Sequence, residues 1–94
     1  MGTPQTKAPP SVVGIDGIRR SPEHEEQISE AMLATFSDGP GARVLAHLRA
    51  VTLNRVLGPG ASDAELRQHE GRRELVAQIM QRMDHARAAR DRRA

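Results

Sequence analysis

Residues 58–66, Gly58-Pro59-Gly60-Ala61-Ser62-Asp63-Ala64-Glu65-Leu66, decide the fold because they end one helix and begin the next. Proline cannot continue a helix, and glycine supplies the left-handed conformations that close one. Ser62 and Glu65 have the spacing of a capping box, in which each side chain satisfies a free backbone donor at a helix start. The stretch predicts a short connection between two antiparallel neighbouring helices.

A third helix is expected over residues 63–90. Large apolar side chains recur there at helical spacing, namely Leu66, Leu75, Val76, Ile79, Met80 and Met83. Gly71 lies in the middle of this segment, where glycine costs up to ~1 kcal/mol relative to alanine. We expect a close approach by another helix at Gly71, and a kink is the alternative.

Two further helices precede this one. Ser21-Pro22-Glu23 combines an N-cap serine, a proline at the first helical position and an acidic first turn, which predicts a helix over residues 22–36. A second helix is expected over residues 41–57. Its apolar stripe consists of Val44, Leu45, Leu48, Val51, Thr52 and Val56. The predicted fold class is all-α: a small antiparallel three-helix hairpin stack over residues 22–90, with a basic C-terminal tail at residues 91–94.

The N-terminal segment, residues 1–21, is rich in proline and glycine, which disfavour a stable helix. We therefore expect an extended arm. Four of its side chains are too apolar for a simple linker: Val12, Val13, Ile15 and Ile18. They either pack on their own domain or dock the arm on a neighbouring subunit or partner.

The composition excludes several classes of protein. The 94 residues contain one Phe and no Tyr, Trp or Cys, which argues against aromatic base-stacking platforms and thiol chemistry. No hydrolase or Walker motif is present, and no two histidines have helical metal-ligand spacing. We expect no enzymatic activity, metal, cofactor or small-molecule substrate. No apolar run is long enough to span a membrane and no signal-peptide pattern opens the chain, so we expect a soluble protein of an internal compartment.

The charge is unevenly distributed along the chain. The net charge is −3 over residues 19–42, +3 over residues 43–57 and +3 over residues 82–94. Near the C-terminus, four arginines form a stripe on one side of the expected helix: Arg82, Arg87, Arg90 and Arg93. This Arg stripe could contact a phosphate backbone or an acidic partner protein. The remaining alternative is a fraying tail whose cations suit a helix C-terminus.

The apolar core is small for this chain length. Between Ile28 and Met83 the sequence holds seventeen large apolar side chains. Their burial falls short of the conformational entropy lost when the segment is ordered. We expect assembly or docking to supply the missing burial.

Several short pieces of the sequence resemble a family of small proteins from tailed bacteriophages and prophages. The pieces are Phe36-Ser-Asp-Gly-Pro-Gly41, Val44-Leu45-x-x-Leu48, Ser62-Asp-Ala-Glu-Leu66 and Glu70-Gly71-Arg72-Arg73-Glu74-Leu75-Val76-x-x-Ile79. The genes of that family tend to lie among those for portal, terminase and head proteins. The resemblance covers about half of the chain, and it implies a non-enzymatic component without catalytic residues.

The resemblance also assigns roles to residues. It implies a family core made of Phe36, Val44, Leu45, Leu48, Gly71, Leu75, Val76 and Ile79. It further suggests a specific polar contact between Glu70 and Arg73. Their spacing alone predicts an ordinary surface ion pair between residues i and i+3 of a helix.

Two functions follow as hypotheses. The first is a structural component of a tailed-phage or phage-like particle at the head or portal, the head–tail connector region. It would assemble in multiple copies and contact portal, capsid or connector proteins, in the virion or in the host cytoplasm during assembly. The alternative is a DNA-binding packaging accessory resembling a small terminase subunit, with the DNA backbone on the Arg stripe.

Overall fold

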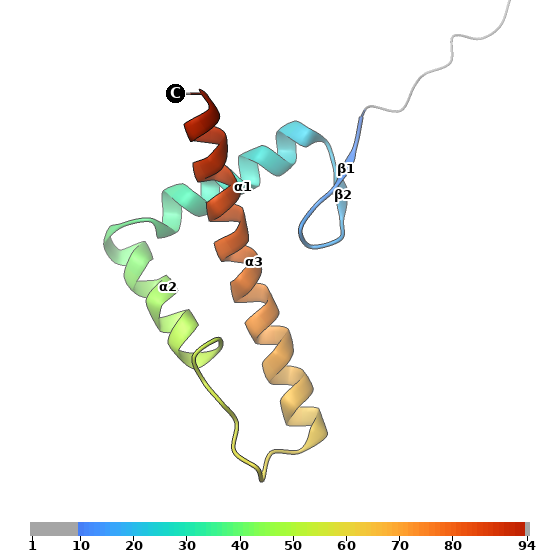
Figure 1. Ribbon diagram of the computed structural model, residues 1–94, viewed down its shortest axis with the longest axis vertical. Coiled ribbons are helices and arrows are strands. Elements are labelled where there is room, and N and C mark those ends of the chain that lie inside the picture. Colours follow the sequence, from blue (N-terminus) through green and yellow to red (C-terminus); the bar gives the residue numbers. More distant parts are fainter. Residues whose placement is uncertain (1–9, 94) are drawn as a thin grey trace, which may run out of the picture.

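The computed structural model describes residues 10–93, which form a mainly helical protein with one small β-hairpin (Figure 1). The strands are β1 (Val12–Val13) and β2 (Arg19–Arg20). The helices are α1 (Pro22–Phe36), α2 (Gly39–Val51) and α3 (Asp63–Arg93). The predicted helical character is confirmed, whereas a purely α class is wrong because of the hairpin.

Helix α3 is the spine of the molecule (Figure 1). Helix α1 crosses the C-terminal half of α3, and this is the most extensive contact between elements. Helix α2 runs antiparallel to α3 beside its N-terminal half, with fewer contacts. The predicted hairpin of antiparallel helices therefore holds for α2 and α3, while α1 lies across α3.

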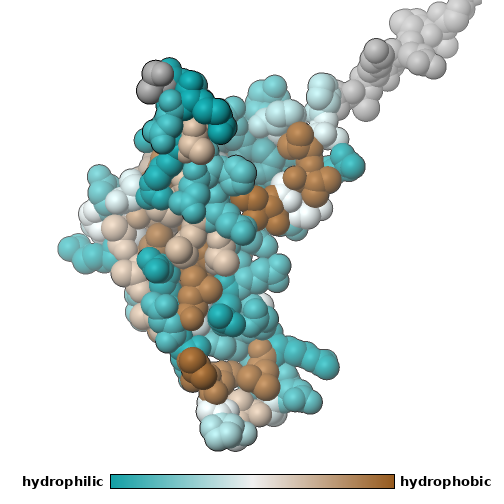
Figure 2. All heavy atoms as spheres, viewed as in Figure 1, coloured by the Kyte–Doolittle hydropathy of each residue, from teal (hydrophilic) through white to brown (hydrophobic). Residues whose placement is uncertain are grey.

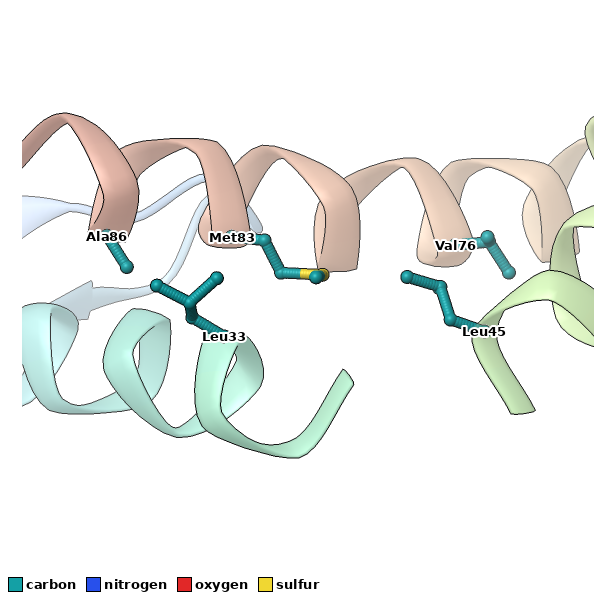
Figure 3. Packing of buried hydrophobic residues seen from close by; sticks show 5 residues of the cluster. All are labelled: Leu33, Leu45, Val76, Met83 and Ala86. Atoms are coloured by element: carbon teal, nitrogen blue, oxygen red, sulfur yellow. The ribbon is translucent and has the colours of Figure 1, made fainter. Parts of the chain in front are cut away.

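The buried core is built at two points along α3 (Figure 3). Leu33 of α1 lies opposite Met83 and Ala86 of α3, and Leu45 of α2 lies opposite Val76. Within the described chain these five are the buried hydrophobic side chains. Each shorter helix thus contributes one buried leucine to the contact with α3.

The implied family core is only partly enclosed. Phe36, Leu48 and Ile79 pack against the buried cluster, but Val44 and Leu75 are 50% and 61% exposed. Each of these two exposed residues precedes a buried one, and successive helical residues point about 100° apart. The expectation of a core position is therefore wrong for Val44 and Leu75 in the single chain.

The N-terminal segment folds back on itself instead of forming an extended arm. Val12 pairs with Arg20 and Val13 with Arg19 in an antiparallel register. The backbone N–H of Gly14 donates to the carbonyl of Ile18 at 2.9 Å, and Gly17 supplies the positive φ of +83° that the turn requires. The predicted arm is corrected to a hairpin over residues 12–20, and residues 1–9 lie outside the described part.

The helix starts follow the local capping signals. The hydroxyl of Ser21 accepts from the backbone N–H of His24 at 3.1 Å. Ser62 accepts from the backbone N–H of Glu65 at 3.1 Å, and the carboxylate of Glu65 accepts from that of Ser62 at 3.3 Å. The start of α1 at Pro22 and the capping box before α3 are confirmed.

The end of α2 differs from the prediction. The helix stops at Val51, six residues before the expected end at residue 57. The buried hydroxyl of Thr52 donates to the carbonyl of Leu48 at 2.6 Å, and the chain then turns so that Leu53 packs against the core. Val56, counted on the apolar stripe, is 92% exposed in the following loop.

Two further boundaries differ in a simpler way. Helix α2 begins at Gly39, two residues earlier than predicted, and α3 continues to Arg93. Residues 91–93 of the predicted tail therefore belong to α3.

The close approach expected at Gly71 lies elsewhere. A Cβ added at Gly71 would meet nothing within 4 Å, so this expectation is wrong. A Cβ added at Gly41 would collide with the backbone carbonyl oxygen of Thr35. The tight junction between α1 and α2 is the place in the fold that depends on a glycine.

Candidate partner-binding surfaces

Four charged side chains fasten the hairpin to the helices. Arg82 of α3 donates to Glu25 of α1, with 3.1 Å between Nη2 and Oε1, and lies 3.7 Å from a carboxylate oxygen of Asp16. Arg20 binds the same two carboxylates at 2.6 and 2.7 Å. We call Asp16, Arg20, Glu25 and Arg82 the charge cluster. It is the point where the hairpin, α1 and α3 meet.

The charge cluster holds its carboxylates in the ionised form. The hydrogen bond from Arg82 lowers the pKa of Glu25 below its ordinary value. The hydrogen bond from Arg20 lowers the pKa of Asp16, and the same contact raises the pKa of Arg20. With two cations and two anions, the cluster is neutral overall and presents no net charge to a partner.

The position of Arg82 corrects the predicted Arg stripe. Its side chain is buried, with the whole residue only 5% exposed, so it does not belong to an open phosphate-binding face. Two sequence signals could have indicated this. Arg82 lies three residues after Ile79 and four before Ala86, on the packed side of the helix, and the acidic first turns of the 22–36 helix offered partners.

The other stripe arginines are exposed and also bind acidic side chains. Arg90 binds Glu30 at 2.9 Å, and Arg93 binds Glu26 at 2.7 Å. The hydrogen bond from Arg90 lowers the pKa of Glu30. Arg87 pairs with Asp84 within α3 at 3.2 Å.

These pairs show where the opposite charges of the sequence go. The acidic α1 and the basic end of α3 neutralise each other within one chain. A partner or phosphate contact at Arg87, Arg90 and Arg93 stays a prediction, and it would have to compete with these internal pairs.

The hairpin forms the first candidate surface. Val13 and Ile18 are 59% and 55% exposed, and Val12 and Ile15 line a hollow of about 450 Å³ against α1 and α3. Apolar side chains gather at this corner in Figure 2. The hairpin is thus held on its own domain by the charge cluster, while part of its apolar surface faces outward. Docking through this surface stays a prediction.

The second candidate surface lies at the opposite end of the molecule. It comprises the loop after α2 and the first turns of α3, and apolar side chains gather there as well (Figure 2). Val56 and Leu66 are exposed in this region. His69 is buried beneath it, and its Nε2–H donates to the carbonyl of Arg55 at 2.9 Å. We call this region the loop-end surface.

The predicted Glu70–Arg73 contact is present as an ion pair of 2.8 Å between residues i and i+3 of α3. Both side chains are more than a third exposed, so the pair contributes little to stability. Its geometry fits the ordinary surface pair that the spacing predicts. A specific role in helix packing or partner binding stays a prediction.

Two further features of residues 10–93 concern metal binding and membrane insertion. No group of three His, Asp or Glu side chains is arranged there to hold a metal ion. None of the helices in that range combines the length and hydropathy needed to cross a bilayer.

Comparison with known proteins places the chain in a family. No curated protein and no solved structure matches it. The model of a family described as Bbp19-like phage protein matches residues 32–94, which is more than half of the chain. The match includes the last turn of α1 and all of α2 and α3, and leaves out the hairpin and the first two-thirds of α1, including Glu25. The chain therefore belongs to the Bbp19-like phage protein family.

Proposed function

We propose that this protein is a non-enzymatic structural component of a phage particle. It assembles in multiple copies at the head or portal, the head–tail connector region, and acts in the virion or in the host cytoplasm during assembly. Its partners are copies of itself and portal, capsid or connector proteins. Membership of a phage protein family supports the general role.

One observation carries the assembly part of the proposal. Among the described residues, eight large apolar side chains are at least 40% exposed, whereas five hydrophobic side chains are buried. Exposed apolar side chains that gather into a patch are typical of protein interfaces, and those of the hairpin and of the loop-end surface gather in this way (Figure 2). The exposed set lies on the hairpin, on α2, in the loop-end surface and on α3: Val12, Val13, Ile18, Val44, Val51, Val56, Leu66 and Leu75.

Sedimentation velocity of the full chain over a range of concentrations tests this assembly. We expect species of integral multiples of the chain mass. Leu75→Glu should shift them towards the monomer, because it places a charge on an exposed apolar side chain. Ala88→Glu is the matched control, since Ala88 is exposed on the same helix. A monomer at every concentration would contradict self-assembly.

Mass spectrometry of purified particles tests the location. We expect peptides of this chain in particles at a constant ratio to a portal or capsid protein. Absence from mature particles would remove the virion role.

DNA packaging is the second candidate function, and one observation favours it. Within residues 10–93, seven arginines form no ion pair: Arg19, Arg43, Arg49, Arg55, Arg67, Arg72 and Arg92. Duplex DNA bound through such side chains should dissociate steeply as salt is raised, and Arg43→Ala with Arg49→Ala should flatten that dependence. No binding at low salt would exclude this function.

A further inference from the structure

A hollow of about 480 Å³ opens within the loop-end surface, between the loop after α2 and the first half of α3. Val56, Leu57 and Leu66 give it apolar walls. Arg55 and Arg67 also line it, are exposed, and form no ion pair among the described residues. The hollow therefore combines apolar walls with cations that are available to a ligand.

Two buried polar atoms in the lining have no hydrogen-bond partner within residues 10–93. They are Nδ1 of His69 and Nε of Arg73. His69 is only 6% exposed, and its Nε2–H donates to the Arg55 carbonyl. In the neutral ring, Nδ1 is then a hydrogen-bond acceptor, while Nε–H of Arg73 is a donor. Buried polar atoms are normally satisfied, so this pair points to a missing partner group.

The chemistry of these two atoms indicates the kind of group that would fit. His69 and Arg73 are four residues apart, so their side chains lie one helical turn apart on the same face of α3. Both atoms are enclosed, so a peptide group would reach them only after the neighbouring side chains move aside; its carbonyl would then accept from Arg73 Nε–H and its N–H would donate to His69 Nδ1. Apolar side chains beside that peptide group would fill the walls formed by Val56 and Leu66.

The charges select an acidic sequence. Three arginines and one glutamate, Glu70, line the hollow, so its potential is positive. The main acidic segment of this chain is a poor occupant, because Glu25, Glu26 and Glu30 are bound to arginines of α3. We assign the hollow to a different protein because a second copy of this chain, with a net charge of +2, complements a positive hollow poorly.

We propose that this hollow binds a short segment of another protein in which an acidic residue neighbours a large apolar one. This inference rests on the proposed function only in requiring a protein partner. The sedimentation experiment tests self-assembly separately, so failure of either idea can be recognised on its own.

Selection of short random peptides displayed on yeast against the full chain tests the proposal. We expect enriched peptides to carry Asp or Glu beside Leu, Ile or Phe. Fluorescence anisotropy with an enriched peptide then gives the affinity. Arg55→Glu with Arg67→Glu should weaken binding about tenfold or more, because it reverses the charge of the rim.

Arg43→Glu with Arg49→Glu is the matched control. These two arginines are exposed on α2, form no ion pair among the described residues and do not line the hollow. The control should change the affinity less than about twofold. If Arg55→Glu with Arg67→Glu unfolds the chain, Leu66→Glu is the second variant, and it should weaken binding to a similar degree.

Three results would overturn the proposal. The first is that the selected peptides are not enriched in acidic residues beside apolar ones. The second is that Arg43→Glu with Arg49→Glu weakens peptide binding as much as Arg55→Glu with Arg67→Glu. The third is that self-association or duplex DNA, and not a peptide, covers the hollow. Chemical shift changes confined to residues around His69 and Arg73 would support it.

Discussion

Along α3, the C-terminal half places Arg82, Arg90 and Arg93 in ion pairs with α1, whereas the N-terminal half leaves Leu66 and Leu75 exposed. The C-terminal half is held by charges that neutralise one another inside the chain. The N-terminal half touches α2 with fewer contacts and keeps apolar and basic side chains open to solvent.

The two halves of α3 therefore have different roles. One interpretation of the sequence placed an anionic partner at the basic end of α3, yet its charges hold α1 and the hairpin. The cations that remain unpaired in the described chain lie mainly on α2, in the loop and in the first half of α3. We therefore expect the C-terminal half to govern stability and the N-terminal half to govern partner binding.

Truncation of one leucine in each half should give the largest difference. Leu33→Ala removes the buried anchor of α1 and should lower the free energy of unfolding by about 3 kcal/mol. Leu75→Ala, on the open half, should lower it by less than about 0.5 kcal/mol in the monomer. Urea denaturation followed by circular dichroism measures both. Equal losses would show that the two halves are packed alike.

Removal of Arg82 from the charge cluster should give the second-largest effect on stability. Arg82→Ala leaves the partly buried Glu25 without its strongest partner, although Arg20 still binds this carboxylate. We expect a loss of about 2–3 kcal/mol in the free energy of unfolding. Arg87→Ala removes only an exposed pair with Asp84 and should cost less than about 0.5 kcal/mol. A small loss from Arg82→Ala would mean that the hairpin stays attached without the cluster.

The start of α1 and the end of α2 show which helix bounds local sequence signals can predict. Its start was predictable from Ser21 and Pro22, because a cap acts on backbone groups within one turn. The end of α2 was not predictable in the same way. It depends on the hydroxyl of Thr52 bonding to the carbonyl of Leu48 and on Leu53 packing against distant helices. Apolar spacing up to Val56 carried no information about those tertiary contacts.

Only part of each candidate site was predictable from the sequence. The Arg stripe and the apolar hairpin residues were visible in the sequence as residue types. Their surroundings were not, because Arg82 meets Glu25 only through the crossing of α1 over α3. The short connection at residues 58–62 predicted that the two sides of the hollow lie near each other, but it did not predict that His69 would be buried between them.

Acid should first weaken the ion pairs between α1 and the C-terminal half of α3. The pKa values of Glu25 and Glu30 are lower in the folded chain than their ordinary value of 4.5, because arginines bind the ionised carboxylates. The unfolded chain therefore takes up protons first, and the free energy of unfolding should fall as pH drops below about 4.5 towards the lowered values. Denaturation at a series of pH values measures the slope. Arg82→Ala should flatten it, and an unchanged slope would assign the acid sensitivity to other carboxylates.

The smallest predicted effect, at Gly71, tests whether another subunit covers the N-terminal half of α3 in an assembly. Gly71→Ala should raise the free energy of unfolding of the monomer by about 0.5–1 kcal/mol, because the added Cβ meets nothing within 4 Å and alanine favours helix. Gly41→Ala is the opposite reference, since its Cβ would collide with the Thr35 carbonyl and should destabilise the chain. Thermal denaturation measures both, and sedimentation velocity measures assembly. A Gly71→Ala chain that is more stable as a monomer yet assembles less would place a neighbouring subunit against Gly71, and the close approach absent within one chain would then occur between two.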